Sequence, residues 1–157
     1  MKVLMDADCL IKLTKSGLKE SVCRFEKVTI PRTVKREVVD AGKVKSYPDA
    51  DIVDQNIKHG LITVARESSP NHPSGDQALI AGFQQGGYEV IATDDARLIR
   101  ILRSAGIPFT VPALLIYALR TKGRIDQKTA LDWLDKLSTF VSSEEYAVTR
   151  LLLEERT

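Results

Sequence analysis

Short apolar runs alternate with amphipathic stretches along most of the chain. Runs of apolar and β-branched residues, typical of buried strands, occupy positions 2–5, 27–30, 61–65, 88–93 and 109–111. Between and after them, helical spacing of apolar residues, with Pro and Gly near the ends, predicts helices at 9–25 (broken near Gly17), 31–40, 48–58, 76–86, 96–105, 112–122, 126–137 and 143–154. This alternation predicts a three-layer α/β/α fold with a mainly parallel central sheet of four to five strands.

The last quarter of the chain is different, because it contains helical patterns only. We expect residues 1–157 to form a single domain, with 112–157 as a helical C-terminal extension packed on it. A chain of 157 residues is long enough to bury a core without disulfides or a structural metal. Residues 68–75 have a loop composition, and Ser74 with Gln77 and Ser142 with Glu145 form capping-box patterns.

Composition narrows the class of protein. The chain is 43% hydrophobic and 28% charged, as ordinary globular domains are. Its longest uncharged apolar run, 111–119, is shorter than the roughly 20 residues of a membrane span, and acidic residues interrupt its first apolar stretch. We therefore expect a soluble, cytoplasmic protein with no membrane association. Cys9 and Cys23 form no disulfide framework and are interpreted as small buried hydrophobes.

Acidic side chains follow two of the predicted strands. The first strand ends in Asp6-Ala7-Asp8, and the fourth ends in Thr93-Asp94-Asp95. In parallel sheets, binding sites form at the carboxyl ends of the strands. The alternative is that Asp is simply common after strands, as a turn former or a helix N-cap.

Two further acids lie on helices, near apolar faces. In the helix at 31–40, Val34, Val38 and Ala41 mark the apolar stripe, and Glu37 falls on its edge. Asp76 precedes apolar residues at i+3, i+4 and i+7, so it heads the buried face of its helix. A charge there is costly unless it is paired or bound to a metal. The alternatives are a first-turn Asp favoured by the helix dipole and, for Glu37, a buried salt bridge.

The four acids come from separate elements that can all point toward the same end of the sheet. Carboxylates gathered in one pocket repel one another, and a hard divalent cation with oxygen ligands, Mg²⁺ or Mn²⁺, relieves that repulsion. The His and Cys residues lack the spacing of a zinc site. We therefore predict that Asp6, Glu37, Asp76 and Asp95 converge on a metal.

The order and spacing of these motifs resemble those of the PIN-domain nucleases over most of the chain. "VLMDADCLIKL" is similar to the family's first strand and acid, "VTIPRTVKREVV" to the segment with its Glu, and "GDQALIAGFQQGGYEVIATDDARLI" to its third acid and Thr-x-Asp motif. The tail segments "VPALLIYALRTKGRI" and "TFVSSEEYAVTRLLLEE" resemble a subgroup with extra C-terminal helices, beyond what the toxin-like members usually contain.

The resemblance implies hydrolysis of RNA phosphodiester bonds with Mg²⁺ or Mn²⁺. By it, Asp6, Glu37, Asp76 and Asp95 are the metal-binding and catalytic quartet, Asp94 is an alternate ligand, and Asp8 and Thr93 are supporting polar residues. We expect Glu37 to orient or deprotonate the attacking water. The number of metal ions, one or two, stays open.

Basic residues near the acids are candidate RNA contacts. Their helices place Arg97, Arg100, Lys35 and Arg36 close to the acidic clusters, and Lys12 follows the first cluster. The alternative for each is an ordinary solvated helix face. The net charge of +2 excludes a strongly basic nucleic-acid clamp but leaves room for such a local patch.

Other functions stay open at this stage. The chain resembles toxins of toxin–antitoxin pairs, which implies a cognate antitoxin protein and a homodimer as partners besides RNA. A catalytically inactive PIN-like module that binds RNA or protein is one alternative. A haloacid dehalogenase-like phosphatase with Asp6 as nucleophile is another, although Leu10 stands where that family has Thr.

Overall fold

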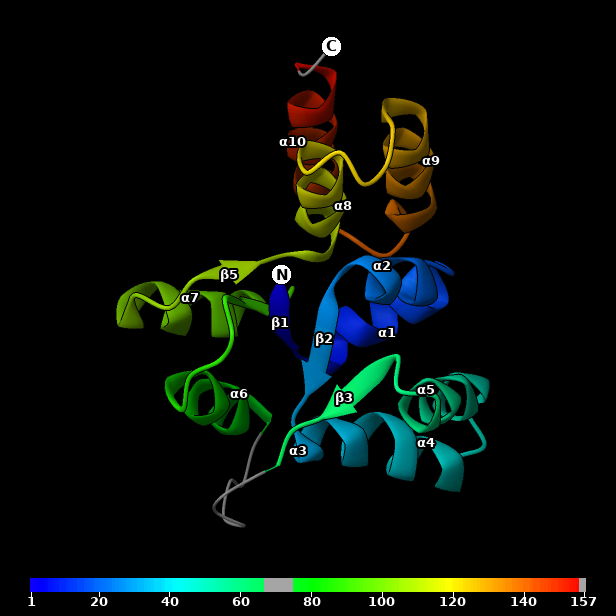
Figure 1. The fold of residues 1–157 in the computed structure, drawn as a ribbon, viewed down its shortest axis with the longest axis vertical. Helices are drawn as coiled ribbons and strands as arrows, with labels where there is room; N and C mark the ends of the chain where they lie inside the picture. Colours follow the sequence, from blue (N-terminus) through cyan, green and yellow to red (C-terminus); the bar gives the residue numbers. More distant parts are fainter. Residues whose placement is uncertain (67–74, 156–157) are drawn as a thin grey trace.

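The computed structural model describes residues 1–66 and 75–155 and shows a parallel sheet between layers of helices (Figure 1). All neighbouring strands pair in parallel in the order β3-β2-β1-β4-β5. The strands are β1 (Lys2–Met5), β2 (Lys27–Ile30), β3 (Ile62–Val64), β4 (Val90–Ala92) and β5 (Phe109–Thr110). The α/β fold class with a parallel sheet, and the upper predicted strand number, are confirmed.

Helices connect and follow these strands. They are α1 (Ala7–Lys15), α2 (Lys19–Phe25), α3 (Arg32–Lys35), η1 (Arg36–Asp40), α4 (Ala41–Val44), α5 (Pro48–Lys58), α6 (Gly75–Gln84), α7 (Ala96–Ala105), α8 (Pro112–Thr121), α9 (Gln127–Leu137) and α10 (Ser143–Glu154). Figure 1 shows α6 and α7 on one side of the sheet and α1, α2 and α5 on the other. No helix in the described residues is long and apolar enough to cross a bilayer.

Alternation along the strands creates two cores, one on each face of the sheet. Val3 and Met5 of β1 join the larger core, which also contains apolar residues of α1, α2, α5 and α8–α10. Leu4 points to the other face and packs with Ile91, Leu79 and other residues of α6 and α7. Because both faces of β1 are buried, β1 is held rigidly, and the residue after it is positioned accurately.

The segment predicted as a helix at 31–40 differs from its pattern. The chain is helical from Arg32 to Val44, but η1 is a π-helical stretch, which shifts the phase of the side chains. Val39 is buried and Ala41 is exposed, so the prediction that Ala41 continues the apolar stripe is wrong. Gly42 does not end the helix; a Cβ there would lie 2.8 Å from the Cβ of Ala50, so glycine permits close packing of α4 on α5.

The C-terminal helices α8–α10 pack on the same core as β1, and α8 contacts α1 and α2. The hydroxyl of Ser142 accepts a hydrogen bond from the Glu145 backbone at 3.0 Å, as the capping box predicts. The Glu145 carboxylate, however, accepts from the backbone N–H of Ala113 instead of returning to its own helix end. Of the loop predicted at 68–75, residues 68–74, with the cap at Ser74, lie outside the described residues, and Gly75 is not in a loop but begins α6. Cys9 and Cys23 are free and buried, as expected.

Candidate active site

A pocket of about 180 Å³ lies at the carboxyl end of β1, between η1, α6 and the start of α7. Five carboxylate residues line it, together with Ala7, Val34, Gly75 and Leu79; the five are Asp6, Asp8, Glu37, Asp76 and Asp95. The four acids singled out in the sequence therefore stand around one pocket, with Asp8 as a fifth. No lysine or arginine lines it among the residues that the structure describes.

Asp6 is the most buried of these acids, with 6% of its surface exposed. It follows β1 and serves as the N-cap of α1: its Oδ1 accepts a hydrogen bond from the Cys9 backbone at 2.8 Å. Its Oδ2 accepts a hydrogen bond from the hydroxyl of Thr93. Burial, opposed by these two bonds and reinforced by the charges of Asp8 and Asp95, raises the pKa of Asp6 to about 6. Without a cation, this carboxylate is thus in an unfavourable environment.

Thr93 connects the ends of two neighbouring strands. Its hydroxyl donates to Asp6 and accepts from the backbone N–H of Asp95 at 3.1 Å. Asp95 is itself the N-cap of α7, and its Oδ1 accepts from the backbone N–H groups of Arg97 and Leu98 at 2.8 and 3.2 Å. The N-cap alternative for Asp6 and Asp95 is therefore correct as a description of their local role. It is compatible with a site, because both also line the pocket.

Glu37 and Asp76 form the opposite wall. Partial burial and the charge of Asp76 raise the pKa of Glu37 above its ordinary value. The side chain of Glu37 also needs Gly75: a Cβ at that position would lie 3.1 Å from Oε1 of Glu37. No ion pair to Glu37 or Asp76 occurs within the described part of the chain, so the buried salt bridge considered for Glu37 is absent there.

Asp94, the alternate fourth ligand in the sequence, does not line this pocket. Its Oδ2 accepts a hydrogen bond from Nζ of Lys12 at 2.6 Å, and the same ammonium lies 3.2 Å from Oδ2 of Asp8. Lys12, which the sequence suggested as a phosphate contact, is therefore engaged with two acids. The geometry favours Asp95 over Asp94 as the acid that faces the pocket.

A residue of the C-terminal extension, Glu145, supports this rim and was missed as a site residue. Its carboxyl is half-buried, bonds with Asp94 and accepts from the Ala113 N–H at 3.1 Å. Burial and the neighbouring Asp94 raise the pKa of Glu145 to about 8. This shift favours the protonated form of Glu145, in which its carboxyl can donate the hydrogen bond to Asp94. The sequence signal was present as a capping-box Glu, but only the packing of α10 on α8 gives it this second contact.

The donors of the pocket suit a hard divalent cation. All are carboxylates, burial together with the charges of neighbouring acids raises the pKa values of Asp6 and Glu37, and Gly75 leaves room beside Glu37. As they stand, no three acidic, His or Cys side chains among the described residues are close enough to hold one ion. A bound ion therefore requires the side chains to rotate inward against their mutual repulsion.

The basic residues predicted to contact RNA are distributed over two surfaces. Arg97 and Arg100 are exposed on α7, and Arg36 is exposed on η1. Lys35 lies 3.4 Å from Oδ1 of Asp40, in a weak exposed pair. None lines the carboxylate pocket. Their role stays a prediction.

Comparison with known proteins identifies a family. A family model described as a PIN domain matches residues 2–155, nearly the whole sequence. The comparison with curated protein sequences finds no match.

Proposed function

The chain belongs to the PIN-domain family, and we propose that it is a divalent-metal-dependent endoribonuclease whose active site is the carboxylate pocket. PIN domains are generally nucleases. The observation that supports the proposal most strongly is the gathering of Asp6, Glu37, Asp76 and Asp95 around one pocket with no cation in its described lining. The family assignment gives no support to the haloacid dehalogenase-like alternative.

In this proposal, Asp6, Asp76 and Asp95 bind Mg²⁺ or Mn²⁺. When bound, the ion lowers the pKa of its water and offsets the negative charge of the phosphate. The protein holds two of the three acids from the ends of adjacent strands, and Thr93 fixes their relative orientation through its two hydrogen bonds. Asp8 lies at the rim, where its pairing with Lys12 positions it.

Glu37 is proposed as the residue that orients the attacking water or accepts its proton. Its raised pKa brings it closer to neutrality, which suits a general base, and it stands on a different wall from Asp6. Glu37 is more exposed than Asp6, so water reaches it readily. It lines the same pocket as Gly75 and Asp76, which supports a role close to a bound ion.

The test is cleavage of a labelled single-stranded RNA in Mg²⁺ or Mn²⁺ and in EDTA. Wild-type protein should cleave only with metal, and Asp6→Asn, Asp76→Asn and Glu37→Gln should each lower the rate by at least about 100-fold. Asp132→Asn, on the exposed surface of α9, is the matched control and should cleave normally. Equal residual cleavage by wild type and all three variants would indicate contamination and contradict the proposal.

A toxin role with a cognate antitoxin is the narrower form of this proposal. It predicts growth arrest on expression that Asp6→Asn abolishes. Harmless expression of a protein with ribonuclease activity would count against the toxin role but not against the enzyme. Persistent RNA binding without any metal-dependent cleavage would instead favour the inactive binding module.

A further inference from the structure

Within residues 1–66 and 75–155, no helix covers one face of the sheet over β2 and β3 as α6 and α7 cover β1. Leu4 pairs in register with Thr29, and Thr29 pairs with Thr63, so these three side chains form a row on one face. Leu4 is buried beneath α6 and α7, whereas Thr29 is only partly buried and Thr63 is exposed. The helix layer on this face therefore does not cover the outer strands as it covers β1.

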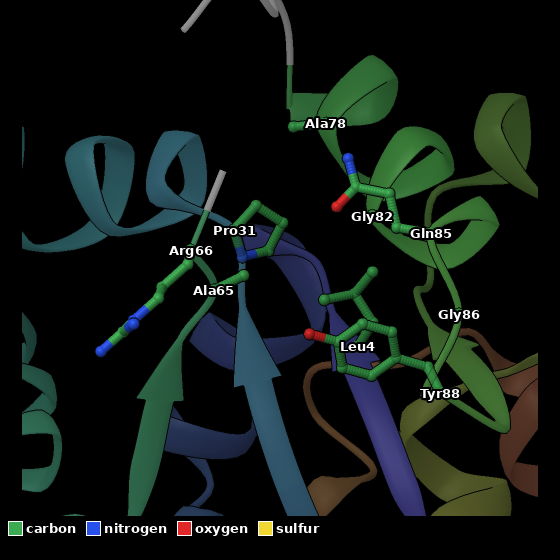
Figure 2. Close-up of a pocket in the computed structure, with 9 residues that line it drawn as sticks. All are labelled: Leu4, Pro31, Ala65, Arg66, Ala78, Gly82, Gln85, Gly86 and Tyr88. Carbon is green, nitrogen blue, oxygen red and sulfur yellow. The ribbon is translucent and has the colours of Figure 1, made fainter. Parts of the chain in front are cut away.

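A pocket of about 200 Å³ lies at the boundary between α6 and this open face. Figure 2 shows its lining, with the Tyr88 side chain over Leu4 and the Gln85 amide reaching toward Pro31. Gly82 permits this shape, because a Cβ there would lie 3.3 Å from Cδ2 of Leu4. This pocket is close to the carboxylate pocket along both β1 and α6. In β1, Leu4 precedes Asp6 by two residues, and in α6, Ala78 follows Asp76 by two.

A larger groove of about 690 Å³ continues from it toward the amino ends of the strands, and both share Gly86 and Tyr88. Three cationic residues line this groove, Lys2, Arg24 and Lys27, and none forms an ion pair with another described residue. Its acid, Glu26, is neutralised by the N-terminal ammonium at 2.6 Å and by Lys122 at 3.0 Å. The groove is therefore electropositive.

Lys2 and Lys27 are register partners on neighbouring strands. Like charges opposite each other in a sheet are destabilising, and an anion between them relieves the repulsion. Lys2 precedes Asp6 by four residues of extended chain, roughly 13 Å at about 3.3 Å per residue. A chain of phosphates crossing from the carboxylate pocket would meet these ammonium groups next.

We infer that single-stranded RNA cut at the carboxylate pocket continues across this open face, with one unstacked base in the pocket between α6 and the sheet and its phosphates on Lys2 and Lys27. This inference rests on the proposed nuclease function and extends it to the path of the substrate. The volume of about 200 Å³ is below that of pockets for drug-sized ligands and suits one planar base. The ring of Tyr88 offers it a stacking surface, which a paired duplex cannot use.

Binding of a labelled single-stranded RNA of about 12 nucleotides in EDTA tests this path, with the integrity of the probe checked on a gel. Lys2→Gln combined with Lys27→Gln should weaken binding about 20-fold at 0.1 M salt and reduce the slope of log K against log salt by about 1.4, for two lost phosphate contacts. Lys128→Gln combined with Lys136→Gln removes the same charge from exposed α9 and should change neither quantity by a comparable amount.

Two variants test the base pocket. Ala65→Leu fills the pocket from its partly exposed rim, and Tyr88→Leu removes the ring while keeping an apolar side chain. Each should weaken single-stranded binding about tenfold and leave binding of the corresponding duplex unchanged. Melting temperatures verify that each variant is folded. Unchanged single-stranded binding by a folded Ala65→Leu variant would overturn the base pocket.

The outcomes separate this inference from the proposed function. Unaltered affinity and salt slope in the Lys2 and Lys27 double variant, with normal cleavage by wild type, would overturn the path and leave the nuclease intact. Selective loss of binding in that variant, with no cleavage by wild type, would overturn the nuclease and support the surface as an RNA-binding face. Equal losses in the α9 control would also overturn the path, because only net charge would then matter.

Discussion

The hydroxyl of Thr93 at the end of β4 donates a hydrogen bond to Oδ2 of Asp6 at the end of β1. The two residues are 87 positions apart in the chain but follow strands that pair directly. The same hydroxyl accepts from the Asp95 backbone, so one side chain orients two acids of the candidate site.

Thr93→Val should therefore disturb Asp6 without changing the size of the core side chain. The variant loses a hydrogen bond that lowers the pKa of Asp6, so that pKa should rise above about 6. Loss of a buried bond to a charged group should cost about 1–3 kcal/mol of folding free energy near neutral pH. Carbon-detected NMR titration and chemical denaturation measure the two effects. Thr93→Ser keeps the hydroxyl, so both the rise in the pKa of Asp6 and the loss of folding free energy should be smaller than in Thr93→Val.

Asp6 should make the metal-free protein less stable as pH rises. Its folded pKa of about 6 exceeds the ordinary value of 3.8, so the folded state binds the proton more tightly than the unfolded state. The stabilisation that comes from this tighter proton binding is fully present below about pH 3.8 and is lost as pH rises through about 6. The free energy of unfolding should fall by at most about 3 kcal/mol over this range. Asp6→Asn should match wild type near pH 4 and be the more stable protein at pH 7.5. Denaturation in EDTA at several pH values measures this; a constant difference between the proteins would refute it.

Divalent metal should offset the destabilisation that the ionised Asp6 carboxylate causes in the metal-free protein. Mg²⁺ or Mn²⁺ bound only by the folded state should stabilise wild type by about 2.7 kcal/mol at 100 times the dissociation constant. Asp95→Asn keeps a good N-cap residue but removes a carboxylate from the pocket, so it should reduce the thermal shift. Asp94→Asn should keep the shift, because Asp94 faces Lys12 and Glu145. If Asp94→Asn reduces the thermal shift more than Asp95→Asn does, then Asp94, and not Asp95, is the acid that binds the metal.

Replacing Glu145 by glutamine should not destabilise the protein. Because its pKa is near 8, Glu145 contributes stability that is present below about pH 4.5 and is progressively lost as pH rises through 8. Glu145→Gln keeps an acceptor for the Ala113 N–H and a donor toward Asp94, so it should remove this loss. It should therefore already be more stable than wild type at pH 6, by a difference that grows up to about pH 8. Glu145→Ala leaves both partners unsatisfied and should cost about 2 kcal/mol. Melting curves between pH 6 and pH 9 measure both effects.

Gly75→Ala should impair cleavage through Glu37 while preserving the fold. The added Cβ would lie 3.1 Å from Oε1 of Glu37, so that carboxylate must move. If Glu37 positions the water, kcat should fall about 10- to 100-fold, with little change in RNA affinity. Asp132→Asn, on the exposed surface of α9 and away from both pockets, is the control and should retain kcat. An unaltered kcat in Gly75→Ala would argue against the role of Glu37.

Much of the fold could be predicted from local patterns. The strand at Lys2–Met5 and the helix at Pro48–Lys58 have the predicted bounds, because continuous apolar runs and an initial Pro signal them strongly. The helix after Pro31 could not be predicted in detail. A π-helical segment shifts its phase, and the reason for Gly42 lies in a contact with Ala50 on the next helix. Such a contact leaves no periodic signal in either segment.

The sequence by itself determined the alternation of strands and helices and the acidic residues at their ends, since both are local properties of hydrophobic spacing and residue type. The sequence left open whether Asp94 or Asp95 is the fourth metal ligand. It gave no indication that Glu145 contacts Asp94 at the edge of the carboxylate pocket. Only the tertiary structure separated the two neighbours, because burial, pairing with Lys12 and the packing of α10 depend on segments far apart in the chain. Side-chain direction at a strand end is decided by those long-range contacts and not by the local residue pattern.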